Sequence, residues 1–294
     1  MKVTGVGGGH GLAATLRAAR LYATEVAAVV TVADDGGSSG RLTRELGIPA
    51  PGDIRNCLVA LSEESALTRL YQHRFAEGAL SDHSLGNLMI AGLTEMTNDF
   101  AEAVKRAGEM LGARGVVHPA TTEVVSLRAS VNGEVVRGQV AVAKSASPIQ
   151  AVYLKPADVP AHEGAVRAIL DADQVVLGPG SLFTSLIATV IVPGIKEALR
   201  RTTATKVFVC NSCTQAGETT ALSAGGHLEA LLAHAGPYAA DVVVVQCPQL
   251  TPAGVVVDHE ALEFSGVEVV EADVAAADGG HDPRRLAEVL RSLV

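Results

Sequence analysis

The sequence predicts an α/β fold, namely a Rossmann-like, doubly wound parallel sheet. Three observations support this prediction. Strand and helix patterns alternate along the 294 residues. Val26–Ala33 is a continuous β-rich run, which is typical of a strand buried on both faces of a parallel sheet. Glycine-rich segments follow the first predicted strand and a later one, where such folds bind phosphate groups.

Short runs rich in β-branched residues indicate the parallel strands. They are Lys2–Val6, Val26–Ala33, Gln174–Leu177, Lys206–Cys210 and Asp241–Gln246. Apolar residues at helical spacing, together with helix start signals, indicate the helices that alternate with these strands. They are Leu12–Arg20, Glu163–Leu170, Leu182–Val190, Gly194–Arg200, His227–Ala235 and Pro283–Leu293.

Two segments depart from this alternation. Residues from about 55 to 112 are mostly helical, and residues from about 123 to 154 alternate apolar and polar around Asn132-Gly133, a strong hairpin signal. We therefore expect an inserted antiparallel unit with strands at Val124–Val131, Val135–Lys144 and Ile149–Leu154. The stretch Ala272–Asp282 is the only linker-like segment and is interpreted as a mobile loop, so residues 1–294 are interpreted as a single domain.

The composition excludes several classes of protein. A formal net charge of −9, no Trp, four Tyr and five Phe argue against a nucleic-acid surface. No apolar run is long enough to span a bilayer, and Met1–Gly7 reads as a strand rather than a signal peptide. The four cysteines lack disulfide-scaffold spacing, which is typical of a reducing compartment. We therefore expect a cytoplasmic protein.

The first glycine-rich segment lies between a predicted strand and a predicted helix. Missing side chains let a phosphate approach the backbone, and the start of the helix supplies free N–H groups. The dinucleotide fingerprint is met only in its loose form, and the alternative is a tight turn without a ligand. The candidate ligand-binding residues are Gly8, Gly9, His10, Gly11 and Leu12.

A second segment, rich in acids and glycines, follows Val26–Ala33. Asp34 lies near the position where Rossmann proteins place a ribose-binding acid. Asp34 and Asp35 are also candidate Mg²⁺ ligands, and Arg41 is a candidate phosphate ligand. The alternative is a solvated, flexible loop. The candidate ligand-binding residues here are Asp34, Asp35, Gly36, Gly37, Ser38, Ser39 and Arg41.

Polar clusters in the helical segment give further candidates. Asp53, Arg55 and Asn56 open a predicted helix, where Asp53 is either an N-cap or part of the site. His83 is either a general acid/base or a histidine at a helix start, with Asn87 nearby. If a reaction is catalysed, Asp53 and His83 are the catalytic candidates.

Later strands end in two more polar segments. A second glycine loop enters a helix after Gln174–Leu177, and its candidate ligand-binding residues are Gly178, Gly180, Ser181, Thr184 and Ser185. The segment after Lys206–Cys210 supplies Asn211, Gln215 and Glu218 as candidates for contacting a base or a sugar. Cys210 and Cys213 have the spacing of a redox or metal pair, but no second pair exists and half a zinc site is not a site, so we disfavour both roles. Two glycine loops on one sheet favour a ligand that spans two strand ends, as a nucleotide with further phosphate or sugar would.

In this order, the clusters resemble the bacterial gluconeogenesis factor family, which is similar to the 2-phospho-L-lactate transferases and shares their Rossmann-like fold. The matches run from Gly7 to Thr219, so they cover most of the chain. The matching motifs are Gly7-Gly8-Gly9-His10-Gly11-Leu12, Ala33-Asp34-Asp35-Gly36-Gly37-Ser38-Ser39-Gly40, Pro51-Gly52-Asp53-Ile54-Arg55-Asn56, His83-Ser84-Leu85-Gly86-Asn87-Leu88, Gly178-Pro179-Gly180-Ser181 and Thr214-Gln215-Ala216-Gly217-Glu218-Thr219.

The resemblance implies binding of UDP-sugars such as UDP-N-acetylglucosamine, and a link between carbon metabolism, peptidoglycan precursor supply and cell shape. In the transferase relatives, acids after the second strand resemble metal and acceptor ligands, and Asp34 and Asp35 occupy the comparable place. His10 stands where the family usually has Thr, so a hydroxyl that could contact phosphate is replaced by an imidazole.

The leading hypothesis is a non-catalytic sensor, in which a bound nucleotide sugar shifts a conformational equilibrium that a regulatory protein partner reads. The alternative is a Mg²⁺-dependent enzyme that transfers a phosphorus-containing group. A NAD(P)-dependent oxidoreductase is a third reading, and it lacks a recognisable hydride-transfer site. A homo-oligomer is a candidate assembly, and we expect neither nucleic-acid nor membrane partners.

Overall fold

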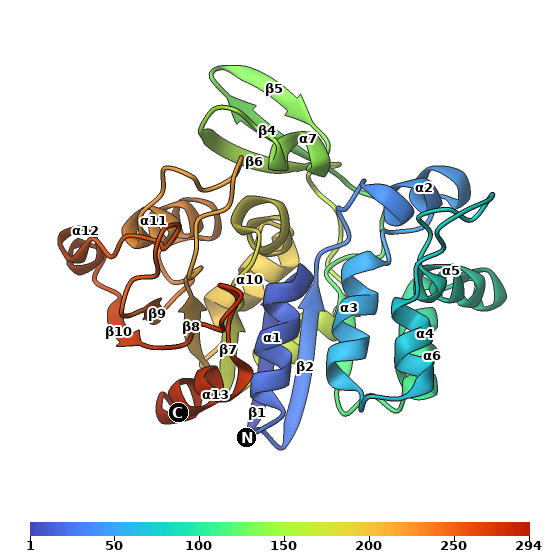
Figure 1. The fold of residues 1–294 in the computed structure, drawn as a ribbon, viewed down its shortest axis with the longest axis horizontal. Coiled ribbons are helices and arrows are strands. Elements are labelled where there is room, and N and C mark those ends of the chain that lie inside the picture. The colour runs from blue at the N-terminus through green and yellow to red at the C-terminus, as the bar shows by residue number, and fades with distance from the viewer.

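A seven-stranded parallel sheet forms the centre of the computed structural model, which describes all residues, 1–294 (Figure 1). The strand order is β10-β9-β8-β7-β1-β2-β3, and every neighbouring pair is parallel. The predicted fold class is therefore confirmed. The strands are β1 Lys2–Gly7, β2 Glu25–Val30, β3 Val116–Pro119, β7 Gln174–Leu177, β8 Thr205–Val209, β9 Val242–Gln246 and β10 Glu268–Ala272.

Helices cover both faces of this sheet. Helix α1 (Gly9–Ala19) packs between α3 (Gly52–Leu61) and α13 (Pro283–Ser292) in front of the sheet in Figure 1. Helices α8 (Glu163–Leu170) and α10 (Pro193–Arg201) pack on each other and cover the other face. The connections run from β1 toward both edges of the sheet. Because each crossover is right-handed, the helices of the two halves cover opposite faces.

The chain reverses its direction across the sheet at β1. From β1 the strands proceed to β2 and β3 on one side, whereas β7 to β10 continue on the other. Val6 pairs with Val29 of β2 and with Leu177 of β7, so the loops after β1 and β7 leave the sheet side by side. Such a topological switch point, at the carboxyl ends of parallel strands, is where open α/β sheets bind ligands.

The segment predicted as helical contains α3, α4 (Ala66–Gln72), α5 (Leu85–Thr97) and α6 (Phe100–Leu111). Three of the four have a side-chain N-cap, because Ser65, Ser84 and Asp99 accept hydrogen bonds from the first turns of α4, α5 and α6. Residues expected in the second loop instead form helix α2 (Gly37–Leu46), which packs against α5.

The inserted unit is a three-stranded antiparallel sheet, β5-β4-β6, which stands above the carboxyl edge of the main sheet (Figure 1). Its strands are β4 Ser126–Val131, β5 Glu134–Arg137 and β6 Ile149–Lys155. The predicted strand Val135–Lys144 is wrong beyond Arg137, because the chain turns at Gly138 (φ 95°) into helix α7 (Gln139–Ala143). Asp35, about a hundred residues away, accepts a hydrogen bond from Val140 N in the first turn of α7, and a local pattern cannot report that contact.

Other boundaries differ from the prediction by a few residues. Helix α1 begins at Gly9 rather than Leu12, and β2 ends at Val30 rather than Ala33. The predicted helix Leu182–Val190 is a π-helix, η1 (Leu182–Ile187), followed by the short α9 (Ala188–Val190). The sequence prediction lacked β3, β10 and α12 (His259–Phe264), whereas α11 (Ala224–Ala235) extends the predicted helix by one turn. Edge strands β3 and β10 carry weaker apolar patterns because one side is unpaired.

No single helix is long and apolar enough to cross a bilayer, and only η1 and α9 taken together with α10, across a 74° bend, meet such a test of length and composition.

Residues 272–282, interpreted from sequence as a mobile loop, are anchored to the sheet. The side-chain oxygen Oε1 of buried Gln246 accepts hydrogen bonds from Val274 N and Ala275 N, both at 2.8 Å. Its amide nitrogen donates to Asp273 Oδ1 and Pro248 O, both at 3.0 Å. One side chain at the end of β9 therefore holds the start of this segment, and the mobile-loop interpretation is corrected.

Gln246→Leu is expected to lower the free energy of unfolding by about 2–4 kcal/mol, because it leaves two buried backbone N–H groups without acceptors. Urea unfolding followed by circular dichroism measures this effect. Gln249→Leu is the matched control, since exposed Gln249 makes one hydrogen bond, to Gly254 O. Equal effects of the two substitutions would contradict the anchoring role of Gln246.

Candidate functional site

The two predicted glycine loops touch each other at the switch point. A Cβ at Gly11 would collide with the carbonyl group of Pro179. A Cβ at Gly180, whose φ is 119°, would lie 3.5 Å from Gly8 O and 3.6 Å from Gly11 Cα. Asn211, which follows β8, accepts a hydrogen bond from Gly180 N at 2.7 Å and donates one to Gly180 O at 2.8 Å. Asn211 thus holds the second loop against the first, and both of its amide atoms are used within the protein.

Asp53 lies directly against the first loop. Its carboxylate accepts a hydrogen bond from Gly9 N, and a Cβ at Gly8 would collide with its Oδ2 atom. Burial, and then the charge of Asp34, raise the pKa of Asp53 to about 7. Asp53 is in the first turn of α3, whose N-cap is Pro51, so the sequence reading of Asp53 as an N-cap is wrong.

Three carboxylates approach one another here, with Asp34 in the middle. Burial and the charge of Asp35 raise the pKa of Asp34, whereas hydrogen bonds from Gly36 N and Ser39 lower it. Asp35 is exposed and binds Val140 N at 3.0 Å. No group of three or more His, Cys, Asp or Glu residues is arranged to hold a metal ion. The charge of Asp34 also raises the pKa of Asp53. Asp34 is thus coupled electrostatically to Asp53 across the site, as well as to Asp35, the second predicted Mg²⁺ ligand.

A buried polar network joins α2, α3 and the start of α5. Ser38 Oγ is 3.0 Å from His83 Nδ1 and accepts a hydrogen bond from Asn87 Nδ2 at 3.1 Å. Arg55, which is 6% exposed, donates to Ser84 Oγ, to Asn87 Oδ1 and to Asn56 Oδ1. Its Nε atom is buried without a partner. The structure thus brings together Ser38, Arg55, Asn56, His83 and Asn87, which the sequence predicted from three separate motifs.

The charges around His83 disfavour a proton on its ring. Burial, and then the positive charge of Arg41, lower the pKa of His83. Arg41 donates to Ser81 O and Arg74 to Asp82 O, so both guanidinium groups hold the hairpin that carries His83. Arg74 was not predicted, and its only sequence signal is that it precedes the His83 motif.

The second loop continues into η1, whose start is capped by Glu218. Its carboxylate accepts hydrogen bonds from Phe183 N at 3.1 Å, Thr184 N at 3.3 Å and Thr184 Oγ1 at 2.6 Å. Thr184 and Ser185 are both buried in η1. Glu218 and Thr184 therefore position the loop through each other. The contact of Glu218 with a sugar or a base stays a prediction.

A cavity of about 400 Å³ opens beside the two loops, on the β8 side of the switch point. His10, Gly11, Gly180, Asn211 and Gln215 line it, as predicted site residues. Arg17 and the segment from Asp278 to His281 complete its wall, and the sequence analysis missed them. The Gly279-Gly280 pair before the last helix was the available signal.

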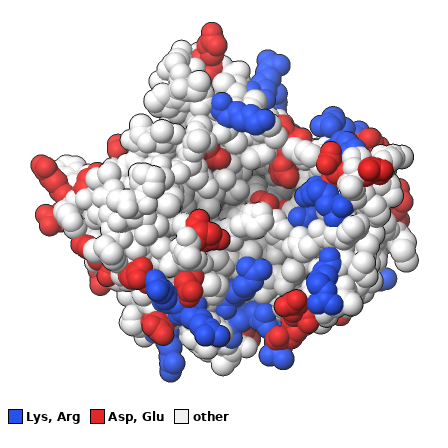
Figure 2. Space-filling view, in the orientation of Figure 1, with Lys and Arg blue, Asp and Glu red and all other residues white.

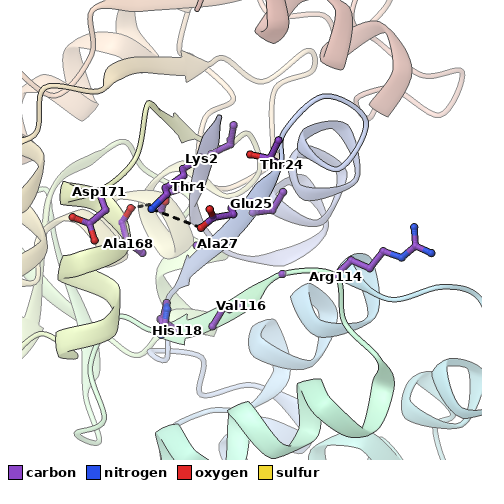
Figure 3. Close-up of a pocket in the computed structure, with 13 residues that line it drawn as sticks. Lys2, Thr4, Thr24, Glu25, Ala27, Arg114, Val116, His118, Ala168 and Asp171 are labelled. Atoms are coloured by element: carbon purple, nitrogen blue, oxygen red, sulfur yellow. Dashed lines mark hydrogen bonds and ion pairs between the residues drawn. The ribbon is translucent and has the colours of Figure 1, made fainter.

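Charged side chains of both signs surround the hollowed centre of the face in Figure 2, below the inserted sheet. Another cavity, of about 430 Å³, lies at the opposite end of the strands (Figure 3). It is lined by the amino-terminal halves of β1 and β2, including Lys2, Thr4 and Glu25, and Thr4 uses its hydroxyl to bind Ala168 O. No glycine loop reaches it, so the carboxyl edge is the candidate site.

Asn211→Leu is expected to lower the free energy of unfolding by about 1–3 kcal/mol, because Gly180 N and O lose their partners. Gln215→Leu is a matched control in the same segment, since the side-chain oxygen of Gln215 has no hydrogen-bond partner. Denaturant unfolding of both variants measures the difference. A larger loss for Gln215→Leu would contradict the clamp.

Asp53→Asn tests the raised pKa of Asp53. Because this pKa is about 7 in the folded protein, against an ordinary value of 3.8, the folded state binds a proton that the unfolded state releases between these pH values. The stabilisation is present at low pH and is lost as the pH rises through 7. The variant should therefore gain stability relative to the natural protein by about 2–3 kcal/mol between pH 5 and pH 8. A difference in unfolding free energy that is independent of pH would refute the assignment.

Comparison with known proteins identifies the same family as the sequence motifs. The family model described as 2-phospho-L-lactate transferase CofD matches residues 3–278. The gluconeogenesis factor of Halalkalibacterium halodurans is 47% identical over 243 residues, which are 81% of this chain and 75% of that protein. The gluconeogenesis factor of Bacillus subtilis is 38% identical over 310 residues, covering 100% of this chain and 98% of that protein.

A solved structure shows the same fold over nearly the whole chain. The crystal structure of a UPF0052 family member from Bacillus halodurans superimposes with a TM-score of 0.95 at 39% identity, covering 99% of this chain and 98% of that one. The identity, coverage and shared fold together show that this chain belongs to the gluconeogenesis factor family, which is related to the 2-phospho-L-lactate transferases.

Proposed function

We propose that this protein binds a nucleoside diphosphate sugar of the UDP-sugar class and acts as a regulatory protein. The contact between the loops at Gly11 and Gly180 carries the proposal. Two glycine-rich loops lie side by side at a switch point, and the first of them opens helix α1, so one diphosphate can reach both. The positive end of α1 favours the negative charge of the ligand without a basic surface.

A sensor role is supported by the way the polar side chains are used. Asn211, Glu218, His83 and Arg55 all bond to other protein groups and hold loops or helices in place. A ligand that changes these bonds shifts the position of α2 or of the inserted sheet, which a protein partner can read. We extend the proposal to a link between carbon metabolism, peptidoglycan precursor supply and cell shape.

A second candidate function is a Mg²⁺-dependent transfer of a phosphorus-containing group. Coupling between Asp34 and Asp53 favours it, because the charge of Asp34 raises the pKa of Asp53. Mg²⁺ usually takes one or two carboxylates and completes its shell with water and phosphate oxygens, so Asp34 and Asp53 fit such an ion. The ion would neutralise charge on a diphosphate. Asp53 would orient the first glycine loop through Gly9 N.

His10→Glu tests the diphosphate site without disturbing the core, because His10 is exposed in the first turn of α1. A carboxylate there should weaken UDP-N-acetylglucosamine binding about tenfold or more through charge repulsion. His10→Gln is the neutral control and should bind within a factor of about two of the natural protein. Calorimetric titration with and without Mg²⁺ measures both variants. Equal affinities of the two variants would place the diphosphate elsewhere.

The same titrations, followed by product analysis, separate the two functions. Selective binding of UDP-sugars with the ligand recovered intact supports the sensor. Consumption of a nucleotide substrate that requires Mg²⁺ and is lost in Asp34→Asn supports the transferase. GDP and NADP⁺ serve as competing ligands, and preferential binding of NADP⁺ would contradict both functions.

A further inference from the structure

We infer that the nucleoside half of the ligand binds on the β8 side of the switch point, in the cavity closed by residues 276–281, rather than on the β2 side. This inference rests on the proposed function, because it assigns an orientation to the proposed nucleotide. Rossmann proteins that bind dinucleotides place the first ribose beside the acid after β2. The inferred orientation is therefore the opposite of the one in those proteins.

The cavity has the size and the walls of a nucleoside site. Its volume of about 400 Å³ lies within the usual range of ligand pockets, roughly 300–1,000 Å³. The start of α1, with His10 and Gly11, forms one wall, and residues 213–215 form another. Gly279 and Gly280 form the third, where the segment before α13 runs beside the amino-terminal end of α1 (Figure 1). The cavity therefore adjoins the diphosphate loops directly, since Gly11 and Gly180 belong to both.

Hydrogen bonds within the protein hold the third wall in place. Ser212 Oγ donates a hydrogen bond to Gly279 O at 2.5 Å, and His281 Nε2 lies 3.2 Å from Cys210 O. Gly280 N donates to Asp278 Oδ1 at 2.9 Å. These bonds fix residues 278–281 to the segment that follows β8, so two chain segments far apart in sequence form one pocket.

Two residues that line this cavity, Gln215 and His281, have a side-chain acceptor without a hydrogen-bond partner in the protein. Gln215 Oε1 is buried and accepts no hydrogen bond, although the backbone of Gln215 is fixed by Thr219 Oγ1 at 2.9 Å. Burial lowers the pKa of His281 to about 4, so its neutral ring donates Nε2–H to Cys210 O and keeps Nδ1 as an acceptor. An unpaired buried acceptor is costly, and an N–H of a nucleobase, such as N3–H of uracil, would satisfy Gln215 once its side-chain amide turns toward the cavity.

The β2 side does not offer an equivalent site. Asp34 is bonded to Gly36 N at 2.9 Å, Asp35 to Val140 N, and Asp53 lies against Gly8 and Gly9. A nucleoside there would place its base beside three carboxylates, two of which already hold backbone N–H groups. That side suits the distal part of the ligand instead, because Asp34 and Asp53 can meet a metal ion and the buried Arg55 has an unpaired Nε–H.

Cavity filling tests this orientation. Ala276 lines the cavity and is partly buried, whereas its neighbour Ala277 is exposed and lies outside it. Ala276→Trp should weaken UDP binding at least tenfold while leaving the affinity for inorganic pyrophosphate unchanged. Ala277→Trp, the matched control, should bind both ligands like the natural protein. Calorimetric titration gives the affinities, and circular dichroism confirms that each variant is folded.

Gln215→Leu keeps the inference testable if Ala276→Trp does not fold. Loss of one hydrogen bond to the base should weaken UDP binding about fivefold and leave the binding of ribose 5-diphosphate and pyrophosphate unchanged. Unchanged UDP affinity in these variants, with pyrophosphate still bound, would overturn the orientation and leave the proposed function standing. If the natural protein binds neither UDP nor pyrophosphate, the proposed function fails and the orientation fails with it.

Discussion

The close approach of two backbone segments at the switch point is the constraint on which the rest of the site depends. Gly11 has no room for a side chain beside Pro179, and Gly180 adopts a conformation that favours glycine. Asn211 fixes the contact through both polar atoms of its amide group. Strands β1, β7 and β8 therefore each contribute one segment to a single small region, and the Glu218 cap on η1 keeps the second segment in register.

Acidic groups surround this region although the proposed ligand is an anion. Asp53 already accepts the hydrogen bond of Gly9 N that a phosphate would otherwise take, and Asp34 lies close enough to raise its pKa. An anion arriving at the first loop must therefore compete with a carboxylate, unless a proton or a divalent cation compensates its charge. Because of this competition, the affinity of the first loop for an anion depends on pH and on divalent cations. Such dependence is compatible with a sensor and with a metal-dependent transferase.

Through the buried network around Ser38, Arg55 and Asn87, the β2 side of the site carries more charged side chains than the β8 side. Arg41, Arg55 and Arg74 bond to neutral oxygen atoms, so their positive charges are not cancelled by direct contacts. On the β8 side, backbone glycines and neutral side chains dominate the cavity wall. A ligand with a flat nucleoside at one end and a polar or charged group at the other matches this division.

The sequence by itself determined the fold class, the order of most strands and helices, and the six motifs that contain nearly all residues near the switch point. It could do so because apolar periodicity and glycine-rich loops are local properties. Only the tertiary structure decided what each polar side chain does. Asn211 and Glu218, which were predicted to contact a ligand, hold the second glycine loop. The charge of Asp34 raises the pKa of Asp53, and Asp35 bonds to the first turn of α7, where the sequence predicted a continuing strand. These bonds join residues from about 20 to over 100 positions apart, so no local pattern encodes them. The wall at Asp278–His281 was missed for the same reason, since Cys210 and Ser212, which follow β8, bond to His281 and Gly279.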